Sequence, residues 1–104
     1  MIVLLNTDNH IVGREKLQVE VQGAVESALD HVRDRVTRVE VYLGDENSHK
    51  GGDNDKRCTI EVHLAGRPPT AVSNHAGTLS DAIQGAADKL QRAVEHEVDR
   101  SSRR

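Results

Sequence analysis

The sequence of 104 residues contains no Trp, no Phe, one Tyr and one Cys. Its core must therefore be built from Val, Leu, Ile and Ala, which bury less area per residue than aromatics do, so a large ligand cavity would be hard to support. A single Cys excludes an intrachain disulfide and a thiolate metal cluster. No apolar run approaches the length of a signal peptide or a membrane span, so we expect a soluble cytoplasmic protein with no membrane partner.

The sequence also lacks an excess of positive charge, with 14 Lys and Arg against 17 Asp and Glu and a formal net charge of −3. Affinity for RNA comes from Lys and Arg side chains that neutralise phosphates and release counterions. It therefore depends on where the basic residues cluster more than on the total. Any RNA-binding hypothesis for this chain requires local basic clusters.

Hydrophobic periodicity predicts four strands and two helices. Alternating apolar residues predict strands at residues 38–43 and 57–64, a β-rich run predicts one at 2–5, and a weaker pattern predicts one at 70–75. Apolar residues three and four apart predict helices from residue 14 to about 35 and from residue 78 onward, the second capped by Thr78 and Asp81. The polar segment 44–56 predicts a mobile hairpin tip, and a polar tail begins at about residue 100.

The order β-α-β-β-β-α predicts an α+β fold. We expect a two-layer sandwich in which a four-stranded, mostly antiparallel sheet carries two helices on one face, because both helices have one apolar stripe and three strands alternate. No repeat or linker divides the sequence, so residues 1–104 are interpreted as a single domain. The order of the strands within the sheet stays open at this point.

The sequence lacks a recognisable catalytic or metal-binding motif. Cys58 falls on the apolar side of an alternating strand, which predicts a buried sulfur with no base beside it. Six histidines are scattered without a His-x-x-x-His pair, and Glu61 and His63 share the polar face of one strand, as solvated surface residues often do. We therefore expect no enzyme activity, no cofactor, no metal and no small-molecule substrate. A small dimeric enzyme using His63 or Cys58 is the least favoured alternative.

Three segments carry a resemblance to a known family: residues 34–43, residues 58–62, and residues 81–92 with the pattern Ala-Ile-x-x-x-x-Asp-Lys-Leu-x-Arg. They resemble the ribosome hibernation factors, which include the hibernation-promoting factor, the ribosome-associated translation inhibitor and proteins labelled sigma-54 modulation protein. The chain is similar to the short form, without the C-terminal dimerisation domain of longer relatives. The resemblance implies a fold like that of double-stranded-RNA-binding domains. The chain departs from the family at Ser80, where an aromatic is usual, and at Glu95, Glu97 and Asp99, where lysines are common.

The resemblance implies binding to the rRNA of the small ribosomal subunit, where the domain blocks the mRNA and tRNA channel of idle ribosomes during stress. By position, Lys89 and Arg92 match the basic pair of the final helix, and Arg35 matches the Arg that ends the first helix. We expect Lys89 and Arg92 to be the main phosphate contacts, with supporting contacts from Arg33, Arg35, Arg38 and Arg100. Because only one Tyr could stack on a base, recognition should depend on RNA shape and phosphate rather than on sequence.

The alternative hypothesis is a diverged protein-interaction module of the same fold that has lost rRNA binding. Such a module would pair with itself, as a weak homodimer, or with a regulator through a sheet edge or the open sheet face. The surface charge distinguishes the two hypotheses. A positive stripe across both helices would favour RNA, whereas carboxylates interleaved among the guanidinium groups would remove the physical basis for rRNA binding.

Overall fold

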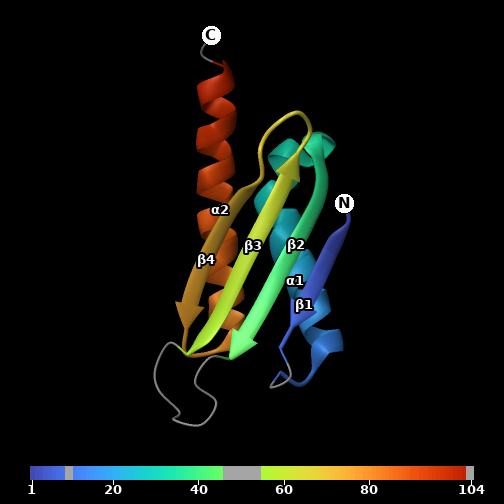
Figure 1. Ribbon diagram of the computed structural model, residues 1–104, viewed down its shortest axis with the longest axis vertical. Helices are drawn as coiled ribbons and strands as arrows, with labels where there is room; N and C mark the ends of the chain where they lie inside the picture. The colour runs from blue at the N-terminus through green and yellow to red at the C-terminus, as the bar shows by residue number, and fades with distance from the viewer. Residues whose placement is uncertain (9–10, 46–54, 103–104) are drawn as a thin grey trace.

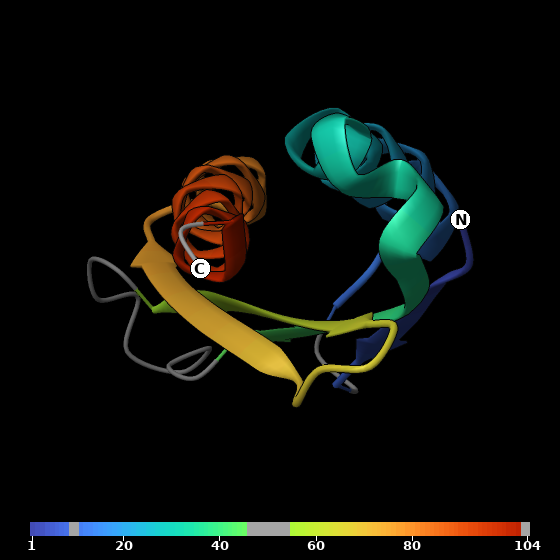
Figure 2. The ribbon, with the colours of Figure 1, turned by 90° about the horizontal axis from the view of Figure 1, so that it is seen from above.

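The computed structural model describes residues 1–8, 11–45 and 55–102, with side chains through Val98. Along the chain the elements are β1 (Val3–Thr7), α1 (Arg14–Leu29), the 3₁₀ helix η1 (Asp30–Arg35), β2 (Val36–Asp45), β3 (Lys56–Leu64), β4 (Thr70–Ala76) and α2 (Leu79–Ser102). The four strands form one sheet in the order β1-β2-β3-β4 (Figure 1). The helices all lie on one side of it (Figure 2). The predicted two-layer α+β fold is confirmed.

The sheet is mixed, because β1 runs parallel to β2 while β2, β3 and β4 pair antiparallel. In every strand alternate side chains point to the helices, as the pleat requires. The inner face is apolar and buried, and consists of Val3, Leu5, Val39, Val41, Leu43, Cys58, Ile60, Val62 and Leu64. The opposite face has no helix over it, so we call it the open face.

Helix α2 lies over β3 and β4. Its buried stripe begins with Ala82, Ile83 and Ala86 and continues to Leu90 and Val94, so small side chains let the helix approach the sheet closely. The predicted cap is confirmed, because the backbone N–H of Asp81 donates to the Thr78 hydroxyl at 3.1 Å. The helix projects past the end of the sheet (Figure 1), and residues 100–102, expected as the start of a polar tail, continue it.

The predicted helix over residues 14–35 is wrong in its last part. Helix α1 ends at Leu29, and η1 follows with a non-helical Val32 at φ −126° and ψ 16°. Leu29 and Val32 are both buried, and the three-residue turn of a 3₁₀ helix keeps residues three apart on the same side. The tighter winding therefore keeps the apolar stripe on the core while the chain turns into β2.

The β2–β3 hairpin is confirmed as antiparallel, with pairing that extends to Asp45 and Lys56. The Lys56 ammonium lies 3.0 Å from an Asp55 oxygen and 3.4 Å from an Asp45 oxygen. The hydrogen bond to Asp55 is the main cause that raises the pKa of Lys56 above its usual value. Residues 46–54, which include most of the predicted mobile tip, lie outside the described residues.

Candidate nucleic-acid interface

A close contact between Gly85 and Asn74 sets the position of α2 on the edge of the sheet. A Cβ atom on Gly85 would lie 2.1 Å from Asn74 Nδ2, so any larger residue at position 85 would force the Asn74 amide to move. Nδ2 of Asn74 donates to the carbonyl oxygens of Asp81 and Ala82, each at 3.4 Å. Gly85 therefore leaves room for an amide that ties β4 to the first turns of α2.

The two basic residues predicted on α2 differ in their contacts: Lys89 is hydrogen-bonded to the protein, whereas Arg92 has no such bond to the residues that the structure describes. Lys89 is exposed, and its Nζ donates to the carbonyl oxygen of Ser73 on β4 at 2.9 Å. Arg92, one turn later, is exposed and makes no hydrogen bond or ion pair within the part of the chain that has described side chains. Its neighbour Glu95 accepts a hydrogen bond from Gln91 at 3.1 Å. Arg92 is therefore the more available of the two for a phosphate.

The two arginines of η1 differ in the same way: Arg33 has ion-pair partners, whereas Arg35 has none among the described residues. Arg33 lies 3.7 Å from Asp30 and 3.8 Å from Glu26, so two carboxylates already compete for its guanidinium. Arg35 is exposed, and its side chain has no partner among residues 1–8, 11–45 and 55–98. Residues Asp30–Arg35 also line a surface hollow of about 320 Å³, which mixes both signs of charge. Arg35 is the available cation of this segment.

The structure does not bring Arg38 together with the other predicted contacts. Arg38 begins the open face of β2, on the opposite side of the sheet from α2 and η1, and its Nε is 3.2 Å from Glu40 Oε1. A single surface that contacts Arg92 on the helical side cannot also reach Arg38 without wrapping around the sheet. Arg100 lies in the last turns of α2, and its side chain is outside what the structure describes.

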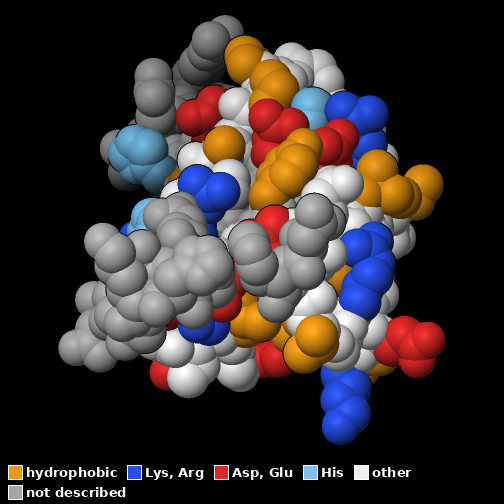
Figure 3. Space-filling view, turned by 60° about the horizontal axis from the view of Figure 1, so that its bottom comes forward, with side chains coloured by type: hydrophobic (Ala, Val, Ile, Leu, Met, Phe, Trp, Pro, Cys, Tyr) orange, Lys and Arg blue, Asp and Glu red, His pale blue; other side chains and the backbone are white. Residues whose placement is uncertain are grey.

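The helical layer is electrically mixed. On α2 the predicted pair is flanked by carboxylates before and after it, η1 carries both acids and bases, and α1 carries only acids after Lys16. The described acidic side chains of this layer are Glu15, Glu20, Glu26, Asp30, Asp34, Asp81, Asp88, Glu95 and Glu97. Figure 3 presents the lower end of the molecule in Figure 1 rather than the helical layer, and there too acidic and basic side chains are interspersed. The continuous positive stripe that would favour RNA is therefore not present among the described residues, and the available cations are isolated.

Two further cations, which the sequence patterns did not single out, hold the framework together. Arg14 donates to the Leu5 carbonyl oxygen at 2.6 Å and so covers the outer edge of β1. Arg67 donates to the Glu97 carbonyl oxygen at 3.1 Å and fastens the β3–β4 turn to α2. Each of these arginines binds a carbonyl oxygen that is distant in sequence. No local sequence pattern could therefore have identified them. Lys89 of α2 donates to the edge strand β4, so Lys89 and Arg14 together place a positive charge at each edge of the sheet, which disfavours strand addition there.

The chemistry-bearing residues of β3 lie on opposite faces. Cys58 is fully buried as predicted, and burial raises the pKa of its thiol to about 12, which keeps it protonated and unreactive. On the open face His63 Nε2 is 3.0 Å from Glu61 Oε1.

Ser80, which replaces the usual aromatic, donates a hydrogen bond to Glu20 and so links α2 to α1. Among the described residues no helix combines the length and hydrophobicity needed to span a membrane.

Residues 6–102 match the family model described as "Sigma 54 modulation protein / S30EA ribosomal protein". The chain belongs to this family. It is a family of ribosome-associated factors and not of enzymes. No curated protein sequence matches the chain.

Solved structures of other proteins share the fold of this chain, among them a Protein Y domain and a ribosomal subunit interface protein. The N-terminal domain of Protein Y from Thermus thermophilus superimposes with a TM-score of 0.74 at 22% identity, over 92% of this chain and 98% of that one. A ribosomal subunit interface protein from Coxiella burnetii gives a TM-score of 0.71 at 11% identity, over 95% of this chain and 99% of that one. At these identities the likeness concerns the fold, and it agrees with the fold predicted from periodicity.

Proposed function

We propose that this protein binds the small ribosomal subunit in the cytoplasm and occupies the mRNA and tRNA channel of idle ribosomes, and so represses translation under stress. The proposal is carried by the family match over residues 6–102 alone, because the mixed charge of the helical layer, which is the arrangement expected to weaken rRNA binding, gives it no support. The fold shared with a ribosomal subunit interface protein supports it. The mechanism is steric occupancy, since a two-layer domain with no catalytic residues assigned to it can act by filling space that RNA ligands need.

Phosphate contacts in this proposal come from a few separate cations. Arg92 on α2 and Arg35 in η1 are the principal contacts, because both are exposed and neither has an ion-pair partner among the described side chains. Lys89 assists from the β4 edge, where one of its three N–H groups is used by Ser73. A site with so few phosphate contacts should bind with a shallow salt dependence, because each contact adds only about 0.7–0.9 to the slope of log affinity against log salt.

Sedimentation of a stationary-phase lysate on a sucrose gradient at low salt tests the association. We expect the protein in the fractions that contain small subunits and whole ribosomes. Exchange of both principal contacts, Arg35→Glu with Arg92→Glu, should move it to the top of the gradient. The control is Lys16→Glu in the first turn of α1, which makes the charge change of one of these two exchanges at the other end of the helical layer and should leave sedimentation unchanged; each single exchange, Arg35→Glu or Arg92→Glu, is compared with it directly. An abundant wild-type protein that stays at the top of the gradient at low salt would refute the proposal.

The interleaved carboxylates favour a second candidate, the protein-interaction module without rRNA binding. In that case purified protein would not shift with ribosomes on a native gel, and size-exclusion mass would exceed that of one chain or rise with a protein partner. Pairing through a sheet edge would have to displace Arg14 from Leu5 or Lys89 from Ser73. The open face is therefore the surface on which this alternative depends.

A further inference from the structure

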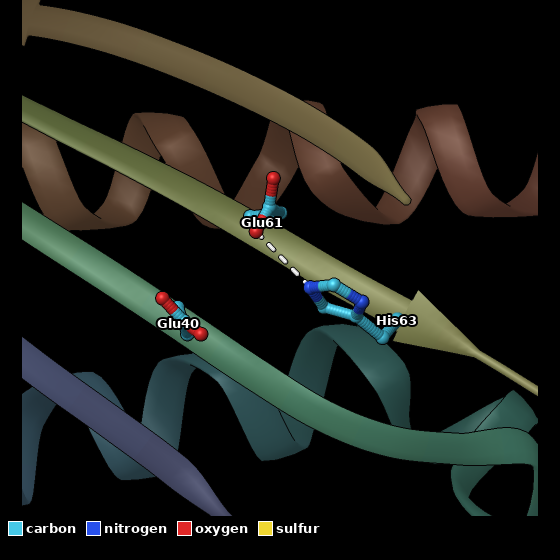
Figure 4. A group of neighbouring side chains, drawn as sticks. All are labelled: Glu40, Glu61 and His63. Atoms are coloured by element: carbon cyan, nitrogen blue, oxygen red, sulfur yellow. Dashed lines mark hydrogen bonds and ion pairs between the residues drawn. The ribbon is translucent and has the colours of Figure 1, made fainter. Parts of the chain in front are cut away.

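Three side chains with metal-binding atoms meet on the open face of the sheet, on the side away from α2 and η1. Glu40 of β2 is paired directly with Glu61 of β3, and His63 lies two residues further along β3 on the same face. Their ligand atoms all lie within 4.8 Å of one another. Figure 4 shows the carboxylates and the imidazole from these two adjacent strands on one side of the sheet.

The two carboxylates form an unfavourable pair unless a cation lies between them, because like charges directly opposite in an antiparallel sheet repel. Both are partly shielded from water, with Glu40 20% and Glu61 36% exposed. Glu40 is partly compensated by Arg38 at 3.2 Å and by a hydrogen bond from the Tyr42 hydroxyl. Within the described part of the chain, Glu61 has one polar partner, His63.

The imidazole of His63 faces two neighbours that one nitrogen cannot satisfy together. Its Nε2 is 3.0 Å from a Glu61 oxygen, which as a carboxylate only accepts hydrogen bonds. The same Nε2 is 3.4 Å from Arg38 Nη2, which only donates. Either a proton or a lone pair points outward from Nε2, so one contact is always unfavourable. A cation bound to the Nε2 lone pair and to both carboxylates removes this conflict and the repulsion between the carboxylates.

We propose that Glu40, Glu61 and His63 bind a divalent transition-metal ion of the Zn²⁺ type. An imidazole with two carboxylates suits Zn²⁺ and its neighbours, whereas Mg²⁺ and Ca²⁺ prefer oxygen-only sites. Tetrahedral Zn²⁺ with bonds of about 2.0–2.1 Å needs ligand atoms roughly 3.4 Å apart. His63 and Glu61 are already near that spacing at 3.0 Å, and a Glu40 oxygen lies within 4.8 Å of both ligand atoms. Three protein ligands leave a fourth position open to solvent.

Arg38 competes with the ion in this arrangement. Its guanidinium is bound to Glu40 and touches His63, and its side chain is 49% exposed, so it can move into solvent when a metal takes its place. Removal of the Arg38 charge should therefore strengthen metal binding, which is the opposite of the effect expected if Arg38 merely supported the cluster. The proposal does not depend on ribosome binding, and its test contains no ribosomes.

The test is calorimetric titration of the metal-free full chain with Zn²⁺, together with NMR of the histidine ring signals. We expect one Zn²⁺ per chain with the ring of His63 shifted, and no comparable binding of Mg²⁺. The variants His63→Gln and Glu61→Gln should each lose at least about tenfold in Zn²⁺ affinity. Arg38→Gln should bind Zn²⁺ several-fold more tightly than the wild type.

The matched control is His75→Gln, which removes an imidazole from the same face of β4 and should retain the wild-type affinity. Thermal unfolding of each variant shows that the sheet is intact, and Glu61→Gln should fold at least as well as the wild type because it removes a like-charge pair. The proposal is overturned if the wild type binds Zn²⁺ no better than His63→Gln does. It is also overturned if His75→Gln weakens binding as much as His63→Gln, or if Arg38→Gln weakens it.

Discussion

The two faces of the sheet are built from alternate residues of the same strands and obey different rules. On β3, Cys58, Ile60 and Val62 face the helices and are fully buried, whereas Glu61 and His63 between and beside them face solvent and bond to each other. The inner face is specified by hydrophobicity alone. The open face is specified by which charge lies beside which, so a count of charged residues says little about what that face can bind.

The largest effect on the free energy of unfolding should follow from truncating a side chain of α2 that packs on the inner face. Leu90 of α2 is fully buried in the core, and Leu90→Ala should lower the free energy of unfolding by about 2–5 kcal/mol because it removes apolar contacts and leaves a cavity. Denaturant unfolding measures this loss. Gln91→Ala, at the next and exposed position, should change it by no more than about 0.5 kcal/mol. Equal losses for the two variants would contradict the division into buried and exposed faces of α2.

A smaller effect should follow at the contact between Gly85 and Asn74. Gly85→Ala should destabilise the protein by about 1–2 kcal/mol, because the new methyl group must displace the Asn74 amide from the α2 carbonyls. In the background of Asn74→Ala the same change should stabilise by up to about 1 kcal/mol, since only the better helix propensity of Ala remains. A double-mutant cycle by urea unfolding checks this reversal of sign. The same sign in both backgrounds would mean that the close approach is not what limits residue 85.

At alkaline pH, burial of the Cys58 thiol on the inner face of β3 should make the protein less stable. Burial raises the pKa of Cys58 from 9.0 to about 12, so between these values the unfolded chain loses a proton that the folded chain keeps. Stability should therefore fall as pH rises above about 9, by up to about 1.4 kcal/mol per pH unit. Cys58→Ala removes this contribution. Urea unfolding under reducing conditions at pH 8.5 and 10 should show a loss that is about 1 kcal/mol larger in the wild type, and parallel losses would contradict burial of the thiol.

The smallest effect should come from the open face. Arg38→Gln breaks an ion pair whose Arg side chain is about half exposed, and exposed pairs contribute less than about 1 kcal/mol. We expect a change in the free energy of unfolding below that value by the same urea measurement. A loss as large as that of Leu90→Ala would show that the open face contributes as much to stability as the inner face, and would contradict the contrast drawn between the two faces.

Sequence reasoning recovered those features that depend on local periodicity. Alternation with a period of two identified the inner residues of β2 and β3, and the Thr78 cap identified the start of α2. The break after Leu29 was missed because Val32, three residues on, also fits a helical stripe. Only the tertiary requirement to turn into β2 distinguishes the two.

For the candidate site, the sequence predicted which basic residues are exposed but not which groups they contact. Helical spacing placed Lys89 and Arg92 on one side of α2, and the structure agrees that both are exposed. That Lys89 donates to β4, and that Arg38 lies on the opposite face beside a histidine 25 residues away, depends on contacts between segments distant in sequence. The same is true of the carboxylates interleaved across the helical layer. Partner choice among charges is a tertiary property, and no local pattern encodes it.

The affinity of the purified chain for purified small ribosomal subunits, measured over a series of salt concentrations, tests the central claim most directly. If Arg35, Arg92 and Lys89 are the phosphate contacts, log affinity should fall with log salt at a slope of roughly −2, and Arg92→Gln should reduce that slope by about 0.7–0.9. Absence of binding at low salt, or a slope that Arg92→Gln leaves unchanged, would contradict a ribosome-binding role for these cations.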